Sequence, residues 1–214
     1  LASIFRESDR WAHILGIPDV GALNEHIISG KSGDVIRVAE ALHEKKIAQI
    51  ADAIANERER MRIILIAGPS SSGKTTFAQR LIVQLRVNGL RPISISLDDY
   101  YLDRDKTPLG KDGKPDFEAL EAIDLRLFNQ HLAMLIQGKE VIVPRFNFHT
   151  GKREYGDTPT RIEKDQPIII EGIHGLNERL TASIPKEKKF KIYVSALTQL
   201  GIDSHNRIST TDTR

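Results

Sequence analysis

The run of residues 68–75, Gly-Pro-Ser-Ser-Ser-Gly-Lys-Thr, constrains this chain more than any other feature, because it fits the pattern G-x-x-x-x-G-K-[ST] at every fixed position. The apolar run of residues 63–67 precedes it, as a buried parallel strand would. Apolar side chains at spacing four follow it and indicate one face of a helix: Phe77, Leu81 and Leu85. The sequence therefore predicts a loop that binds a nucleoside triphosphate. A serine-rich surface turn that matches by chance is the alternative.

The residue types of this loop suit phosphate binding. Glycine adopts at low cost the backbone conformations that aim several N–H groups at one phosphate, and a helix that starts at the loop adds the positive end of its dipole. Lys74 would reach the β- and γ-phosphates as a catalytic residue, and the Thr75 hydroxyl would ligate Mg²⁺. The residues predicted to bind ATP through its phosphates are Gly68, Ser70, Ser71, Ser72, Gly73, Lys74, Thr75 and Thr76.

Net charge and cysteine content exclude some classes of protein. The chain has 31 Lys and Arg against 29 Asp and Glu, a net charge of +2, so no strong positive field favours nucleic acid as a partner. It has no cysteine, which excludes disulfides and fits a reducing, cytoplasmic location. No apolar run approaches the ~18 residues of a membrane span. A homo-oligomer is compatible with this composition.

The sequence pattern divides the chain near residue 60. Residues 1–60 carry apolar side chains at helical spacing and predict a helical N-terminal extension, and residues 61–214 hold the predicted core. The chain starts at Leu1 rather than Met and stops inside a functional segment. We therefore expect a fragment, in which the extension is the tail of an upstream region and the core is cut at the start of a lid.

Two further predicted strands end in acidic residues. Residues 92–97 alternate apolar and small polar side chains and lead into Asp98, and an apolar run leads into Glu171. Ligands of open α/β sheets bind at the carboxyl ends of the strands. Asp98 is therefore a candidate catalytic residue, and Glu171 would face the metal ion. The alternatives are that Asp98 only caps a turn and that Glu171 is held only by a local hydrogen bond.

Five pieces in order resemble the uridine kinase branch of the uridine kinase and phosphoribulokinase family. They are residues 68–75, 96–101, 116–124, 144–153 and 168–172. The resemblance implies that Asp98 is the general base for a sugar 5′-hydroxyl and that Glu171 is the acid near Mg²⁺. Glu118 stands where the family has an aspartate that holds the ribose hydroxyls. The acceptor-binding residues that the resemblance implies are Tyr101, Phe117, Glu118, Phe148 and Arg153.

The chain departs from the family pattern in the segment that reads the base. Gly151 stands where the family has a histidine that contacts the uracil ring, and a glycine has no side chain to bind a base edge. Strand alternation places His149 away from Phe148, so His149 would not replace that contact. The resemblance thus implies kinase chemistry but not uridine specificity. Residues 211–214 resemble the start of the family's arginine-bearing lid helix.

Together these features predict a three-layer α/β fold of the P-loop nucleoside triphosphate hydrolase type, with a mostly parallel sheet behind a helical extension. The function they indicate is ATP- and Mg²⁺-dependent phosphoryl transfer to a hydroxyl of a nucleoside or related small molecule. An ATP-binding regulatory or RNA-linked module without such an acceptor is the alternative. The sequence does not identify the acceptor or distinguish ATP from GTP.

Overall fold

A computed structural model describes residues 2–182, 184–195, 200–203, 205 and 206. The chain divides into two compact units. One unit comprises Leu1–Gln49 together with Ser195–Arg214, and the other comprises Ile50–Val194. The segment expected to begin a lid, residues 211–214, lies outside the described residues.

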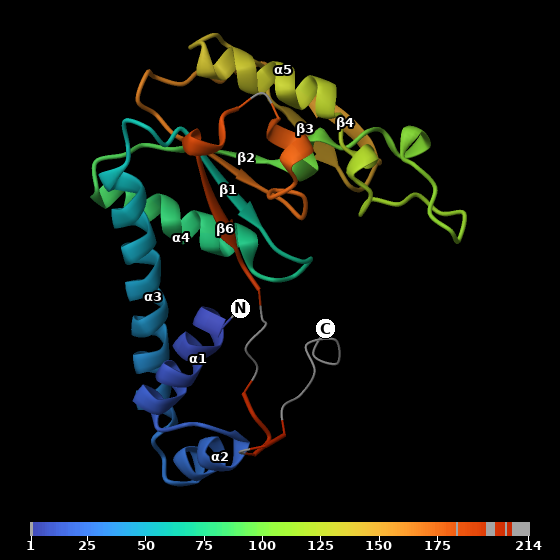
Figure 1. The fold of residues 1–214 in the computed structure, drawn as a ribbon. Helices are drawn as coiled ribbons and strands as arrows, with labels where there is room; N and C mark the ends of the chain where they lie inside the picture. Colours follow the sequence, from blue (N-terminus) through green and yellow to red (C-terminus); the bar gives the residue numbers. More distant parts are fainter. Residues whose placement is uncertain (1, 183, 196–199, 204, 207–214) are drawn as a thin grey trace. The chain divides into compact units, whose positions relative to one another are not determined.

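The first unit is built on helices. They are α1 (Ala2–Leu15), α2 (Val20–Ile28) and the first part of α3 (Ser32–Asn56) (Figure 1). Asp19 starts α2, because its carboxylate accepts a hydrogen bond of 2.9 Å from the backbone N–H of Ala22. Helices thus occupy most of residues 2–56. In the described part of the chain, no helix has the length and apolar character needed to cross a membrane.

A parallel sheet forms the centre of the second unit. Its strands are β1 (Ile63–Ala67), β2 (Ile93–Ser96), β5 (Ile168–Glu171) and β6 (Lys189–Tyr193), in the order β2-β5-β1-β6. All of the pairings between them are parallel. The carboxyl ends of the strands therefore meet at one edge of the sheet.

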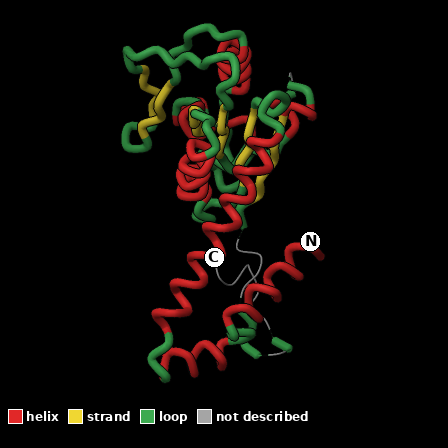
Figure 2. Tube along the Cα trace, turned by 90° about the vertical axis from the view of Figure 1, so that its left-hand side faces the viewer, coloured by secondary structure: helices red, strands yellow, loops and turns green. Residues whose placement is uncertain are grey.

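Helices cover both faces of this sheet, as Figures 1 and 2 show. Ile63 and Leu65 of β1 lie in the apolar cluster that contains the buried side of α5 (Leu125–Ile136). Ile64 and Ile66 are also fully buried, and strand alternation directs them to the opposite face, on which α4 (Lys74–Val87) packs. The predicted three-layer α/β fold with a parallel sheet is confirmed.

A separate two-stranded hairpin follows α5. It pairs β3 (Pro144–Asn147) with β4 (Lys152–Tyr155) in antiparallel register. Val141, just before the hairpin, forms an isolated bridge with Thr160.

A tight approach after β5 yields a prediction for stability. A Cβ atom at Gly175 would lie 2.7 Å from the backbone oxygen of Ile66, which cannot rotate away. We therefore expect Gly175→Ala to lower the free energy of unfolding by about 1–3 kcal/mol, as overpacking does. Gly156→Ala is the matched control, because nothing lies within 4 Å of its Cβ position. Equal chemical denaturation midpoints for the two variants would contradict this packing.

Candidate active site

The phosphate loop joins β1 to α4 at the carboxyl edge of the sheet. Gly73, the residue before α4, has a φ of 84°, and Ser71 has a φ of 58°, which is uncommon for a residue other than glycine. A Cβ atom at Gly68 would lie 2.1 Å from the carbonyl oxygen of Val194, so only glycine fits there. These constraints hold the loop in one curved conformation.

The polar groups of the loop are arranged around its centre. Lys74 Nζ spans the loop and donates a hydrogen bond of 2.8 Å to the carbonyl oxygen of Pro69. Ser72 Oγ is buried and has no hydrogen-bond partner within the described structure. The first turn of α4 adds backbone N–H groups at the positive end of a helix. A cation, an orphaned hydroxyl and a helix N-terminus together make an anion-binding loop.

Glu171, at the end of β5, connects three elements. Its side chain is only 8% exposed, and its Oε1 atom accepts hydrogen bonds from Ser96 Oγ at 3.0 Å and from Thr75 Oγ1 at 3.4 Å. Thr75 belongs to the first turn of α4, and Ser96 is the last residue of β2. The two residues predicted to hold a metal ion, Thr75 and Glu171, therefore lie together.

Asp98 lies in the short 3₁₀ turn that follows β2, Leu97–Tyr100. Burial raises the pKa of its carboxyl group, and the negative charge of Glu171 raises this pKa further. The positive charge of Lys74 opposes the shift. Both predicted catalytic residues thus meet at this edge. A carboxylate with a raised pKa is the better proton acceptor, which suits a general base.

Four aromatic rings form a cluster beside Asp98. This aromatic cluster consists of Tyr101, Phe117, Phe146 and Phe148, and its ring centroids lie 5.1–6.4 Å apart in edge-on contacts. The Tyr101 hydroxyl donates to the carbonyl oxygen of Phe117 at 3.0 Å, and burial, together with the negative charge of Asp98, raises the Tyr101 pKa. Three residues predicted to bind the acceptor are therefore together. Phe148 is 59% exposed and leaves one side of the cluster open.

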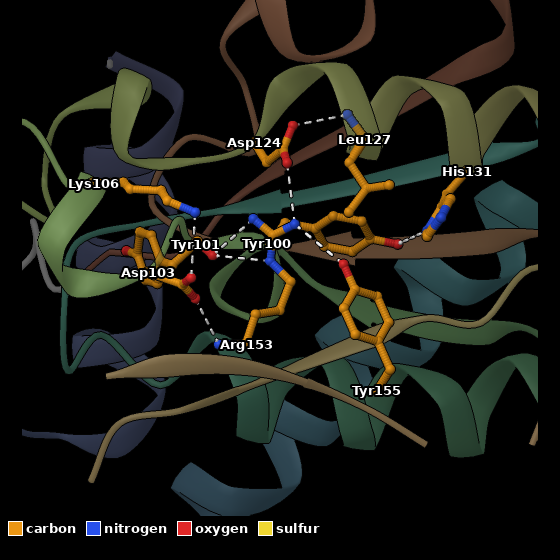
Figure 3. A network of polar contacts seen from close by, with 9 residues as sticks. All are labelled: Tyr100, Tyr101, Asp103, Lys106, Asp124, Leu127, His131, Arg153 and Tyr155. Carbon is orange, nitrogen blue, oxygen red and sulfur yellow. Dashed lines mark hydrogen bonds and ion pairs between the residues drawn. The ribbon is translucent and has the colours of Figure 1, made fainter. Parts of the chain in front are cut away.

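Glu118 and Arg153, the other predicted acceptor-binding residues, differ in their surroundings. Glu118 is exposed. After burial and Asp98, its negative charge is a further cause of the raised pKa of Tyr101. The Arg153 guanidinium, by contrast, is turned toward protein groups (Figure 3). It donates to the carbonyl oxygen of Tyr101 at 3.0 and 3.2 Å and to Asp124 Oδ2 at 3.1 Å. Arg153 therefore holds β4 against the segment that carries Tyr101.

Asp124 links this network to α5. Its Oδ2 atom accepts a hydrogen bond from Arg153, and its Oδ1 atom caps the helix by accepting one of 3.0 Å from the backbone N–H of Leu127 (Figure 3). The Arg153 side chain is only 11% exposed. Burial of this ion pair makes it sensitive to the loss of either partner.

The sequence reasoning missed two residues beside the site, Phe146 and His174. Phe146 completes the aromatic cluster, and its spacing of two from Phe148 was the available signal. Asp99 accepts a hydrogen bond of 3.2 Å from the backbone N–H of Phe146. The Nε2 atom of His174 is buried and has no hydrogen-bond partner in the described structure. His174 also opposes the rise in the pKa of Asp98. Its position three residues after Glu171 could have drawn attention to it.

The sequence analysis used strand alternation to place His149, and that reasoning was wrong. His149 lies in the turn after β3 rather than in a strand, so alternation does not set its direction. Asn147 causes the turn, because its Oδ1 atom accepts from the backbone N–H groups of His149 and Thr150 at 3.0 and 3.2 Å.

The parallel sheet, the glycine loop and the acidic residues at the strand ends define a P-loop nucleotide-binding fold. A likeness to a solved structure supports the same fold. The chain superimposes on a Bacillus stearothermophilus protein described as a possible uridine kinase with a TM-score of 0.52 at 19% identity, over 69% of this chain and 80% of that one.

The sequence comparison identifies the family. The chain belongs to the phosphoribulokinase / uridine kinase family, whose model matches residues 63–208. It is 34% identical to a uridine kinase of Serratia proteamaculans over 62% of this chain and 61% of the relative. It is 37% identical to a uridine kinase of Chloroflexus aurantiacus over 52% of this chain and 51% of the relative. The matched region thus spans between half and two thirds of these relatives.

The raised pKa of Asp98 predicts an unusual effect of its removal. A carboxyl group whose pKa is higher in the folded state stabilises the fold at low pH, and this contribution is lost as the pH rises through the folded-state pKa. At pH 7 the buried charge therefore costs stability. We expect Asp98→Asn to raise the melting temperature at pH 7 but not at about pH 3.

Thermal unfolding at both pH values tests this expectation. Asp157→Asn, at an exposed position, is the matched control and should leave the melting temperature unchanged at pH 7. An Asp98→Asn protein that is less stable than the wild type at pH 7 would show that the carboxylate is not destabilised by its surroundings.

Proposed function

We propose that this protein transfers the γ-phosphoryl group of ATP to a hydroxyl group of a nucleoside or a related small molecule. One observation carries the proposal: the turn Leu97–Tyr100, which contains Asp98, joins Ser96, whose hydroxyl bonds to Glu171 beside the phosphate loop, to Tyr101 of the aromatic cluster. A carboxylate between an anion-binding loop and a set of flat apolar rings suits proton abstraction from an acceptor hydroxyl. Membership of the phosphoribulokinase / uridine kinase family supports this reaction class.

The donor side of the reaction follows from the phosphate loop. Its backbone N–H groups and Lys74 bind the β- and γ-phosphates, so Lys74 Nζ exchanges the Pro69 carbonyl oxygen for phosphate oxygens. Thr75 and Glu171 would hold Mg²⁺, which when bound neutralises the charge that develops on the phosphates. Among the described residues no cluster of three or more acidic, histidine or cysteine side chains forms a metal cage. Phosphate oxygens and water would complete the coordination, as is common for this ion.

The acceptor side follows from Asp98 and the aromatic cluster. Asp98 accepts the proton of the acceptor hydroxyl while the oxygen of that hydroxyl forms a bond to the γ-phosphorus. The bond between the γ-phosphorus and the oxygen of the leaving ADP breaks in the same step. The aromatic cluster contacts the flat ring of the acceptor, and Glu118 binds its sugar hydroxyls. Arg153 acts on this side by holding Tyr101 in place.

Further assignments extend this proposal. We place the protein in the cytoplasm, which its lack of cysteine supports. We assign the reaction to a core that starts near residue 61 and the preceding helices to an extension. A homo-oligomer remains a prediction.

Acceptor-dependent release of ADP tests the proposed function. The full-length protein is supplied with ATP and Mg²⁺ and with a panel of nucleosides and sugars, uridine and cytidine first. We expect at least one acceptor to stimulate release. Tight ATP binding without stimulation by any acceptor would contradict the proposal and favour an ATP-binding regulatory or RNA-linked module.

Replacement of Asp98 separates proton abstraction from donor binding. Asp98→Asn keeps the shape but removes the base, so we expect turnover to fall about 10²–10⁴-fold. ATP affinity, measured by calorimetry, should not weaken, because the phosphate loop is intact. Turnover close to that of the wild type would show that Asp98 is not the general base.

Replacement of Lys74 tests the donor site. Lys74→Ala removes the cation that spans the phosphate loop, and we expect the dissociation constant of ATP to rise by at least about tenfold, the effect of losing one or two charge-assisted hydrogen bonds. Arg80→Ala, further along α4, is the control and should retain ATP binding. An unchanged dissociation constant in Lys74→Ala would refute the assignment of the loop.

A further inference from the structure

The Arg104 side chain occupies the space next to Gly151 that a side chain at position 151 would fill. Gly151 lies in the turn of the hairpin with a φ of +67°. A Cβ atom built on it would lie 2.8 Å from Arg104 Nε, 2.9 Å from Arg104 Cζ and 3.0 Å from Arg104 Cβ. The side chain of Arg104 therefore passes over the space that a side chain at position 151 would fill.

Two hydrogen bonds hold Arg104 against the hairpin turn. Its backbone N–H donates to the carbonyl oxygen of Gly151 at 2.8 Å, and its Nη2 atom donates to the carbonyl oxygen of Phe148 at 2.9 Å. The first bond fixes the backbone, and the second fixes the direction of the guanidinium. Because a guanidinium carries five N–H donors, a single bond to Phe148 leaves most of them for a ligand.

Arg104 also lies next to the aromatic cluster. Phe148, whose carbonyl oxygen it contacts, has its ring 5.1 Å from that of Phe146 and 6.4 Å from that of Tyr101. Asp98 lies at the Tyr101 end of this cluster and Arg104 at the Phe148 end. Arg104 is exposed, so its guanidinium is accessible to a ligand that contacts the open side of Phe148.

We propose that Arg104 determines which acceptor the site selects. This inference rests on the proposed function. With its hydroxyl at Asp98 and its ring against the aromatic cluster, an acceptor presents its far edge to the Arg104 guanidinium. A guanidinium only donates hydrogen bonds, so Arg104 favours an oxo group at that edge and disfavours an amino group. Uridine carries an oxo group at position 4 of its ring, where cytidine carries an amino group, and the site therefore prefers uridine.

The two nucleosides provide the test in the full-length protein with ATP and Mg²⁺. We expect kcat/KM to be higher for uridine than for cytidine in the wild type. Arg104→Ala should lower kcat/KM for uridine by about 10- to 100-fold, mainly through KM, since a hydrogen bond to a charged group supplies that factor. For cytidine the value should change by less than about threefold. The preference for uridine is then lost.

Two more variants separate recognition from hairpin support. Gly151→Ala forces the Arg104 side chain away without removing it and should shift the uridine-to-cytidine ratio in the same direction. Lys111→Ala removes an exposed cation seven positions further along the chain and should leave the ratio unchanged. ATP affinity in each variant reports whether the fold is intact.

The outcomes distinguish the inference from the function on which it rests. Equal losses for uridine and cytidine in Arg104→Ala would mean that Arg104 only supports the hairpin, and would overturn the inference while the proposed function stands. Wild-type protein that phosphorylates neither nucleoside also overturns it. The response to the other acceptors of the panel then shows whether the proposed function fails as well.

Discussion

The site depends on the hydrogen bonds that the Glu171 carboxylate accepts. Parallel pairing places Glu171 level with Ile66 of β1 on one side and with Ser96 of β2 on the other. Its Oε1 atom then accepts hydrogen bonds from the hydroxyls of Ser96 and Thr75, and so joins β2, β5 and the start of α4. A buried carboxylate is costly unless hydrogen bonds satisfy it. The same bonds that satisfy Glu171 therefore also fix the relative positions of the phosphate loop and the turn that carries Asp98.

This arrangement costs stability at the site. Asp98 is partly buried close to Glu171, and two carboxylates in one region raise the pKa of the group that is less well bonded. The positive charge of Lys74 offsets part of the cost without removing it. A base with a raised pKa is what proton abstraction from a hydroxyl requires. The buried carboxylate of Asp98 thus lowers the stability of the fold and at the same time makes Asp98 a stronger base, a combination that is common at catalytic sites.

The sequence predicted the parts of the site that are local in the chain. The strand, loop and helix around residues 68–75 were predicted because their residue types and periodicity are contiguous, and Asp98 and Glu171 followed from the rule that strand ends form the site. Contacts between distant residues were not predictable, because no local pattern encodes them. The bonds from Arg153 to Tyr101 and from Phe146 to Asp99 join residues 52 and 47 positions apart.

A crystal structure of the full-length protein with a non-hydrolysable ATP analogue, Mg²⁺ and uridine would test the central claim most directly. That claim is that the phosphate loop, Glu171 and Asp98 form one centre for phosphoryl transfer. The account predicts that Lys74 Nζ leaves Pro69 for a phosphate oxygen, and that an acceptor hydroxyl lies within hydrogen-bonding distance of Asp98 and in line with the γ-phosphorus. An analogue bound away from residues 68–75, or a uridine whose hydroxyls all point away from Asp98, would contradict it.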